Sequence, residues 1–197
     1  MLEQQSGPKE PTSDGGTEGD LDAILTEGQI VLLMVPPAAI PSSVLEILSH
    51  LTKRGIKGIF VSVTRTFDAL QRVFDGKGID RNSIFVIDTL SGRSGARGDE
   101  PARCLYVSSP AALSDISILL DTALDQLGQG AFLLFDSVAT LLMFNQFESV
   151  VKFFGFLTTK LRKRRLLGVL FTLSTEERRL SDHISVFCDR VLERGMV

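Results

Sequence analysis

Residues Ile30–Gly55 read IVLLMVPPAAIPSSVLEILSHLTKRG and join an apolar strand to a helix through a short turn. The uninterrupted apolar run Ile30–Val35 is typical of a strand that is covered on both faces. Ser42 or Ser43 is predicted to cap a helix that runs through Lys53, and Gly55 supplies the left-handed residue that ends it. In parallel α/β sheets, a junction of this kind lies where ligands bind.

The rest of the chain repeats this alternation of short apolar runs and amphipathic stretches. Further strands are predicted at Ile59–Val63, Ser83–Asp88, Leu105–Val107, Ala131–Phe135, Leu167–Leu173 and, as an edge strand, Arg190–Glu193. Helices are predicted at Phe67–Phe74, Ser114–Leu127, Gln146–Arg164 and Leu180–Cys188. The pattern predicts an α/β fold, a three-layer αβα sandwich in which helices cover both faces of a mostly parallel central sheet.

Length and composition indicate one globular domain behind a polar tail. The 197 residues suit a single domain, and the 44% hydrophobic and 23% charged residues are typical of a soluble protein. Residues 1–20 are rich in Gly, Pro, Ser, Thr and acidic residues, which predicts a disordered tail ahead of a domain at 21–197. The net charge of −3 gives no support to a nucleic-acid or anionic-membrane partner.

The expected compartment is the cytoplasm. The sequence has only two cysteines, which favours a reducing environment over a disulfide framework. No basic segment followed by an apolar run marks a secretory signal, and no apolar run reaches the roughly 20 residues that span a bilayer. We therefore expect no membrane association.

A second junction joins an apolar strand to an acid. Leu133–Phe135 leads directly into Asp136 and Ser137. A strand that ends in aspartate beside a strand that ends in a phosphate-binding loop is how nucleotide hydrolases hold magnesium. An apolar strand also commonly ends in aspartate to cap the following turn, so the pattern alone leaves both roles open.

The order of these segments resembles the RecA/KaiC-like branch of P-loop ATPases, in particular the short single-domain KaiC-like proteins common in archaea. The resemblance covers residues 25–194 and rests on generic segments in a moderately specific order. These are Arg54-Gly55 with Ile59–Ser62, Phe85–Thr89, Ser108–Pro110, Leu134–Leu142 with Asn145, Phe153–Arg162, Gly168–Thr172 and Cys188–Val191. The resemblance implies a RecA-like sheet in which the strand ending in Asp136 occupies the Walker B position.

The resemblance also implies a glycine- and lysine-containing phosphate loop after Val35, and this sequence lacks it. Prolines 36, 37 and 41 have no N–H to donate, and no lysine lies between Val35 and Leu51. A vestigial nucleotide site would consist of Pro37, Ser42, Ser43, Asp136 and Ser137, with Asp136 as the only metal ligand. The segment Ser62–Asp68, where KaiC-like ATPases carry catalytic acids, offers only Asp68, which we expect inside a helix.

The favoured interpretation is a pseudo-ATPase with no catalytic residue and no cofactor, acting as a regulatory or protein-interaction module. One alternative is an active ATPase that binds ATP and Mg²⁺ through an unorthodox loop. Another is a DNA-binding accessory protein of the recombinase-paralogue type, which would use the basic cluster Lys160, Arg162, Lys163, Arg164 and Arg165. The helix around Phe153–Leu157 carries more apolar residues than one stripe needs, which predicts self-association or a protein partner.

Overall fold

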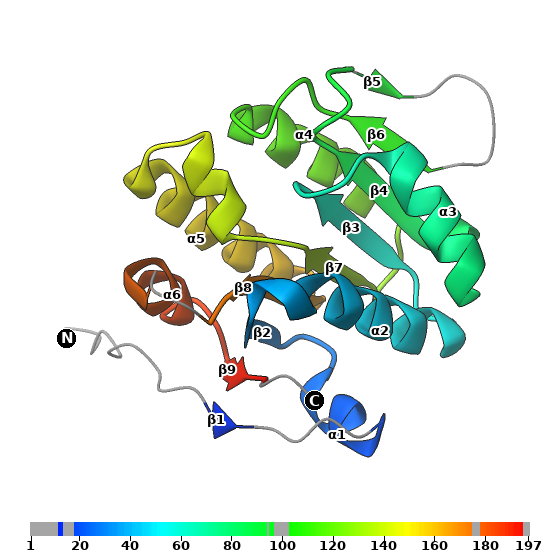
Figure 1. The fold of residues 1–197 in the computed structure, drawn as a ribbon, viewed down its shortest axis with the longest axis horizontal. Coiled ribbons are helices and arrows are strands. Elements are labelled where there is room, and N and C mark those ends of the chain that lie inside the picture. The colour runs from blue at the N-terminus through cyan, green and yellow to red at the C-terminus, as the bar shows by residue number, and fades with distance from the viewer. Residues whose placement is uncertain (1–11, 14–17, 94, 97–102, 175–177, 195–197) are drawn as a thin grey trace.

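A computed structural model of the chain describes residues 12–13, 18–93, 95–96, 103–174 and 178–194. The described strands form one nine-stranded sheet in the order β1-β9-β2-β8-β7-β3-β4-β6-β5 (Figure 1). Every neighbouring pair is parallel except β5 and β6. The predicted mostly parallel α/β fold is therefore confirmed.

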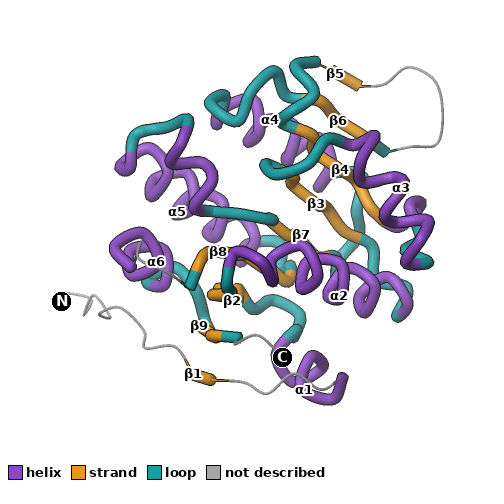
Figure 2. The backbone as a smooth tube through the Cα atoms, viewed as in Figure 1, coloured by secondary structure: helices purple, strands orange, loops and turns teal. Residues whose placement is uncertain are grey.

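Strands and helices alternate along the chain, except that β4, β5 and β6 follow one another without a helix between them (Figure 2). The strands are β1 (Thr12–Ser13), β2 (Ile30–Val35), β3 (Gly58–Ser62), β4 (Ile84–Asp88), β5 (Gly95–Ala96), β6 (Cys104–Tyr106), β7 (Phe132–Phe135), β8 (Leu167–Leu173) and β9 (Arg190–Glu193). The α-helices are α1 (Glu18–Ile24), α2 (Ile40–Lys53), α3 (Phe67–Lys77), α4 (Leu113–Leu124), α5 (Phe147–Lys163) and α6 (Arg178–Ser185). Three short 3-10 helices complete the list: η1 (Pro37–Ala39), η2 (Arg81–Ser83) and η3 (Ala139–Met143).

Each central strand contributes to two separate cores. In β2, the side chains of Ile30, Leu32 and Met34 pack with α4, α5 and α6, whereas those of Val31, Leu33 and Val35 pack with α1, α2 and α3. This alternation follows from the two-residue period of a strand. It explains why the strand sequence is apolar throughout, and it confirms the predicted three layers.

The sheet has one more strand at its first edge than expected. β9 lies between β2 and the two-residue strand β1, so the prediction of Arg190–Glu193 as an edge strand is wrong. The edge of β9 that faces away from β2 has backbone groups free to pair with another extended segment. Thr12–Ser13 pairs with this edge. Regular structure thus begins within the segment predicted as a disordered tail, and α1 also starts there, at Glu18. Residues 1–11 and 14–17 of that segment lie outside the described residues.

Candidate functional site

The turn between β2 and α2 is a compact apolar corner. It forms the 3-10 helix η1, closed by a hydrogen bond from the Ala39 N–H to the Pro36 carbonyl at 2.9 Å. α2 begins at Ile40, so Ser42 and Ser43 are not its caps as predicted. Pro41 takes a first-turn position, where its missing N–H costs nothing, and the helix therefore starts ahead of both serines.

Neither serine of this turn is placed to hold a phosphate or a metal. The Ser42 hydroxyl is exposed and donates to the Ala39 carbonyl at 3.0 Å. Ser43 is buried within α2 and does not line the cavity described below. A phosphate-binding row of N–H groups requires a glycine-like backbone, whereas this turn is a 3-10 helix of proline and alanine in which Pro37 has no N–H to donate.

Asp136, directly after β7, is held by the end of the neighbouring strand. Its Oδ1 accepts from the Val63 N–H at 2.9 Å. Its Oδ2 accepts from the Ser62 hydroxyl at 2.9 Å, the Thr64 hydroxyl at 2.5 Å and the Thr64 N–H at 3.3 Å. Four donors match the about four acceptor positions of a carboxylate. Asp136 therefore ties the carboxyl ends of β3 and β7 together.

Burial dominates the electrostatics of this carboxyl group. Asp136 is only 2% exposed. Loss of hydration raises the pKa of Asp136 above its ordinary value of 3.8, and the hydrogen bonds from Thr64, Val63 and Ser62 oppose this increase. A buried acid with these partners serves as a structural acceptor.

Asp88 makes a second tie of the same kind at the end of β4. Its carboxyl group is fully buried and accepts from the Phe67 N–H, the first of α3, at 2.6 Å, and from the Leu90 N–H at 2.8 Å. Asp68 lies in the first turn of α3, as predicted. The two buried acids at this edge thus fix loops and a helix start.

A cavity of about 310 Å³ opens between Asp136 and the β2–α2 turn. Its polar lining residues are Thr64, Arg65, Asp136, Ser137 and Thr140. Its apolar lining residues are Pro37, Ile40, Pro41, Val44 and Leu45 around the start of α2, with Phe60, Leu70 and Leu173 from β3, α3 and β8. Apolar groups therefore surround the place that the resemblance assigns to a nucleotide.

The structure brings together three of the five predicted site residues. Pro37, Asp136 and Ser137 line the cavity, whereas Ser42 and Ser43 do not. The sequence interpretation missed Arg65 and Thr140 as lining residues. The signal for Arg65 was its place just after β3, since the carboxyl ends of parallel strands meet at one edge of the sheet.

Three basic side chains of the predicted cluster form ion pairs with acidic residues of the chain. Lys160 pairs with Asp121 at 2.7 Å and Arg164 with Asp125 at 2.6 Å. Arg162 pairs with Asp189 at 2.7 Å. The cluster therefore offers less positive charge than its sequence indicates, which weakens the case for a phosphate-binding face.

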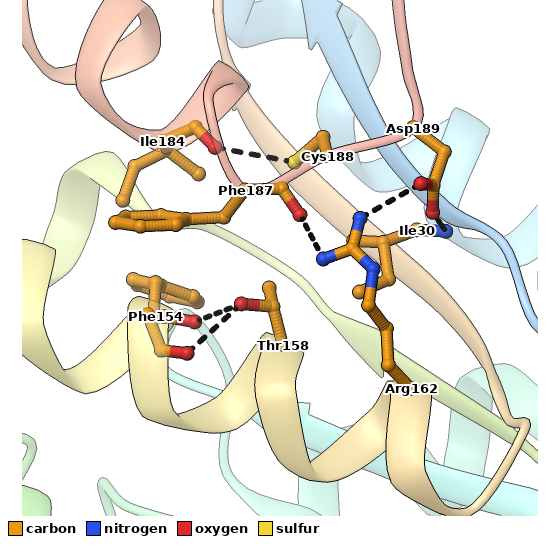
Figure 3. A network of polar contacts seen from close by, with 9 residues as sticks. Ile30, Phe154, Thr158, Arg162, Ile184, Phe187, Cys188 and Asp189 are labelled. Carbon is orange, nitrogen blue, oxygen red and sulfur yellow. Dashed lines mark hydrogen bonds and ion pairs between the residues drawn. The ribbon is translucent and has the colours of Figure 1, made fainter. Parts of the chain in front are cut away.

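Arg162 also organises the joint between α5 and the start of β9 (Figure 3). Its guanidinium donates to the Phe187 carbonyl at 2.9 Å, next to its ion pair with Asp189. The other oxygen of Asp189 accepts from the Ile30 N–H, the first of β2, at 2.7 Å. This arginine thus has a structural role that accounts for its position.

Most of the apolar surface of α5 is covered within the chain. Val150, Phe153, Phe154 and Leu157 are buried, and the rings of Phe153 and Phe154 pack edge-on against Phe135. The sequence predicted that several apolar residues of this helix would remain exposed. The large apolar side chain of α5 that is strongly exposed is that of Phe156, at 76%. The apolar face of α5 is broad because the sheet, η3 and α6 all contact this helix.

The described residues contain neither a metal-binding cluster nor a membrane-spanning helix. Among the residues that the structure describes, no three His, Cys, Asp or Glu side chains gather as they would around a metal ion. Within the same ranges, no helix combines the length and apolar character that crossing a bilayer requires.

Comparison with known proteins agrees with this architecture. A KaiC-like protein from the hyperthermophilic archaeon Pyrococcus horikoshii OT3 superimposes with a TM-score of 0.61 over 88% of this chain and 75% of its own, at 16% identity. This likeness shows a shared fold and confirms the predicted RecA-like α/β architecture. The comparison with curated proteins found no match. The model of the family of unknown function DUF7504 matches residues 35–193, and the chain therefore belongs to that family.

Proposed function

We propose that this protein is a non-catalytic RecA-like domain, a pseudo-ATPase, that acts as a regulatory or protein-interaction module. The observation that carries the proposal is the state of Asp136. The carboxyl group that would hold the metal waters of an ATPase is instead bonded to Ser62, Val63 and Thr64. A magnesium-bound nucleotide would have to displace these donors, and each buried donor left without a partner costs about 1–3 kcal/mol.

The β2–α2 turn supports the same conclusion independently. Pro37 and Pro41 lack an N–H, and the Ala39 N–H is already bonded to the Pro36 carbonyl. No lysine or arginine lies between Val35 and Leu51. The binding energy that a phosphate loop normally provides is therefore missing.

We expect ATP to bind this protein no more tightly than the millimolar range. Each absent charge-assisted hydrogen bond removes about 1.5–3 kcal/mol, and loss of several weakens binding by orders of magnitude. Titration of a fluorescent ATP analogue, with and without Mg²⁺, measures this directly, alongside a phosphate-release assay. A RecA-like ATPase with an intact phosphate loop serves as the positive control. Saturable Mg²⁺-dependent binding at micromolar concentration would overturn the proposal in favour of the ATPase alternative.

Exposed apolar side chains on α4 and α5 support the interaction part of the proposal. Phe156 is 76% exposed and Ile118 is 62% exposed. Lys160, one turn after Phe156, reaches Asp121 and Ser117 beside Ile118, so the two helices lie side by side. Large exposed apolar groups on one layer of a domain are typical of a contact surface.

We expect the protein to associate at micromolar concentration, and the F156S substitution to reduce this association. Removal of a phenylalanine from a contact costs about 1.5–3 kcal/mol of buried apolar area. Light scattering after size-exclusion chromatography measures the association. K152S, at an exposed position of the same helix, is the matched control. A strict monomer for the wild type, with no protein partner recovered alongside it, would contradict the expectation.

A further inference from the structure

The cavity at the carboxyl edge of the sheet is lined by hydrogen-bond donors that nothing in the described structure uses. Arg65 contributes the first of them. Its backbone is fixed, because its N–H donates to the Ser62 hydroxyl oxygen at 3.2 Å. Its carbonyl lies 2.9 Å from the same hydroxyl and shares the one hydroxyl proton with Asp136. Its guanidinium has no hydrogen bond or ion pair with any residue that the structure describes. Among the described residues, this half-buried cation at the wall of the cavity therefore has no anionic partner.

Ser137 and Thr140 contribute a second donor. Their hydroxyl oxygens are 2.7 Å apart, and the Thr140 N–H also donates to the Ser137 oxygen at 3.2 Å. Two hydroxyl groups joined by one hydrogen bond use only one of their two protons. The other proton has no acceptor among the described residues, although Ser137 is only 2% exposed. This proton is therefore available to an acceptor group of a bound ligand.

The same lining has no free carboxylate that could neutralise a cation or an amine. The one carboxyl group, that of Asp136, already receives four hydrogen bonds. The remaining walls are apolar, from Ile40, Val44 and Leu45 on one side to Leu173 on the other. The complementary ligand therefore has an acceptor-only anionic head and an apolar body.

The volume of the cavity sets the size of that body. A water molecule occupies about 30 Å³ of liquid, so the 310 Å³ cavity has room for about ten non-hydrogen atoms. We infer that this cavity binds a small apolar monocarboxylate, with its carboxylate on Arg65 and the Ser137–Thr140 hydroxyl pair and its chain against α2. This inference depends on one part of the proposed function, namely that nucleotide phosphates do not occupy the cavity.

Isothermal titration of the full-length protein with octanoate tests the inference, with octanol as the uncharged analogue. We expect saturable binding of octanoate and binding of octanol that is at least tenfold weaker. R65Q should weaken octanoate binding about tenfold or more while leaving octanol binding unchanged, because it removes only the charged hydrogen bonds. R72Q, which changes an exposed arginine on α3 outside the cavity lining, should bind octanoate as the wild type does.

A second variant tests the apolar wall. L45D places a carboxylate at a half-buried lining position, where it repels the ligand head and removes apolar contact. It should abolish octanoate binding while the thermal unfolding profile stays cooperative. No octanoate binding to the wild type, or equal binding by R65Q and R72Q, would overturn the inference. ATP titration of the same samples reports separately on the proposed function, because ATP binding would refute that function whatever octanoate does.

Discussion

Replacement of Asp136 by alanine is expected to lower the free energy of unfolding by about 3 kcal/mol at about pH 5. The substitution leaves the N–H of Val63, which is 1% exposed, without its acceptor, and the N–H of the exposed Thr64 also loses its partner. Each such orphaned donor costs about 1–3 kcal/mol, and the hydroxyls of Ser62 and Thr64 lose a partner as well. Urea unfolding followed by circular dichroism measures the change.

The matched control is D115A. Asp115 is exposed in the first turn of α4, where an acid contributes no more than about 1 kcal/mol through the helix dipole. A similar small loss for D136A would contradict the role of Asp136 as a tie between β3 and β7. If Asp136 instead held metal waters, D136N would leave stability close to that of the wild type and would abolish Mg²⁺ dependence of nucleotide binding.

The dependence on pH separates burial from hydrogen bonding at this carboxyl group. Because burial raises the pKa of Asp136 above 3.8, the folded protein keeps this proton to a higher pH than the unfolded chain does. The contribution of the group to stability is therefore complete below about pH 3.8 and is lost as the pH rises through the folded-state pKa. The stability difference between wild type and D136N should shrink over that window, by at most about 1.4 kcal/mol per pH unit. A difference that grows with pH would show that the hydrogen bonds outweigh burial.

Replacement of Gly58 by alanine should be the second severe change, with an expected loss of about 2–3 kcal/mol. Gly58 opens β3 and pairs with Phe132 on one side and Ile84 on the other. A Cβ at this position would lie 2.5 Å from atoms of the Phe132 ring, which is fully buried between the sheet and its helices. The ring has no free space to move into, so strain spreads to the strand pair. Chemical denaturation of G58A gives the magnitude.

Two further variants show whether the ring is the cause. G58A combined with F132L should recover part of the loss, since the smaller side chain yields space to the new methyl group. G76A, at an open position inside α3 where nothing lies within 4 Å, should instead raise stability by up to about 1 kcal/mol. Equal effects of G58A and G76A would contradict the close approach of Gly58 and Phe132.

The sequence predicted the strands well where burial on both faces of the sheet alone determined which residues are apolar. Ile30–Val35 and Leu167–Leu173 were predicted with their exact bounds, because strands covered on both faces are continuous apolar or nearly apolar runs. The start of α2 was predicted too late, because serine is the stronger cap signal whereas Pro41 fixed the first turn. Local preferences of similar strength compete at such a boundary.

The site was only partly predictable, for a reason of topology. The position of Asp136 after a buried strand placed it at the carboxyl edge. Its donors Ser62, Val63 and Thr64 lie more than 70 residues earlier in the chain, and only the adjacency of β3 and β7 in the sheet brings them to it. No local pattern encodes which strands become neighbours, so neither the tie nor the cavity wall at Arg65 was foreseen.

The order of strands in the sheet has a consequence for synthesis on the ribosome. β2 is made before any other long strand, yet its neighbours in the sheet are β8 and β9, which are made last. Its six buried apolar residues remain without their partners while the ribosome completes residues 36–166. A nascent chain exposed in this way is a natural substrate for holding chaperones, and the sheet can close only after residues 167–193 have been made.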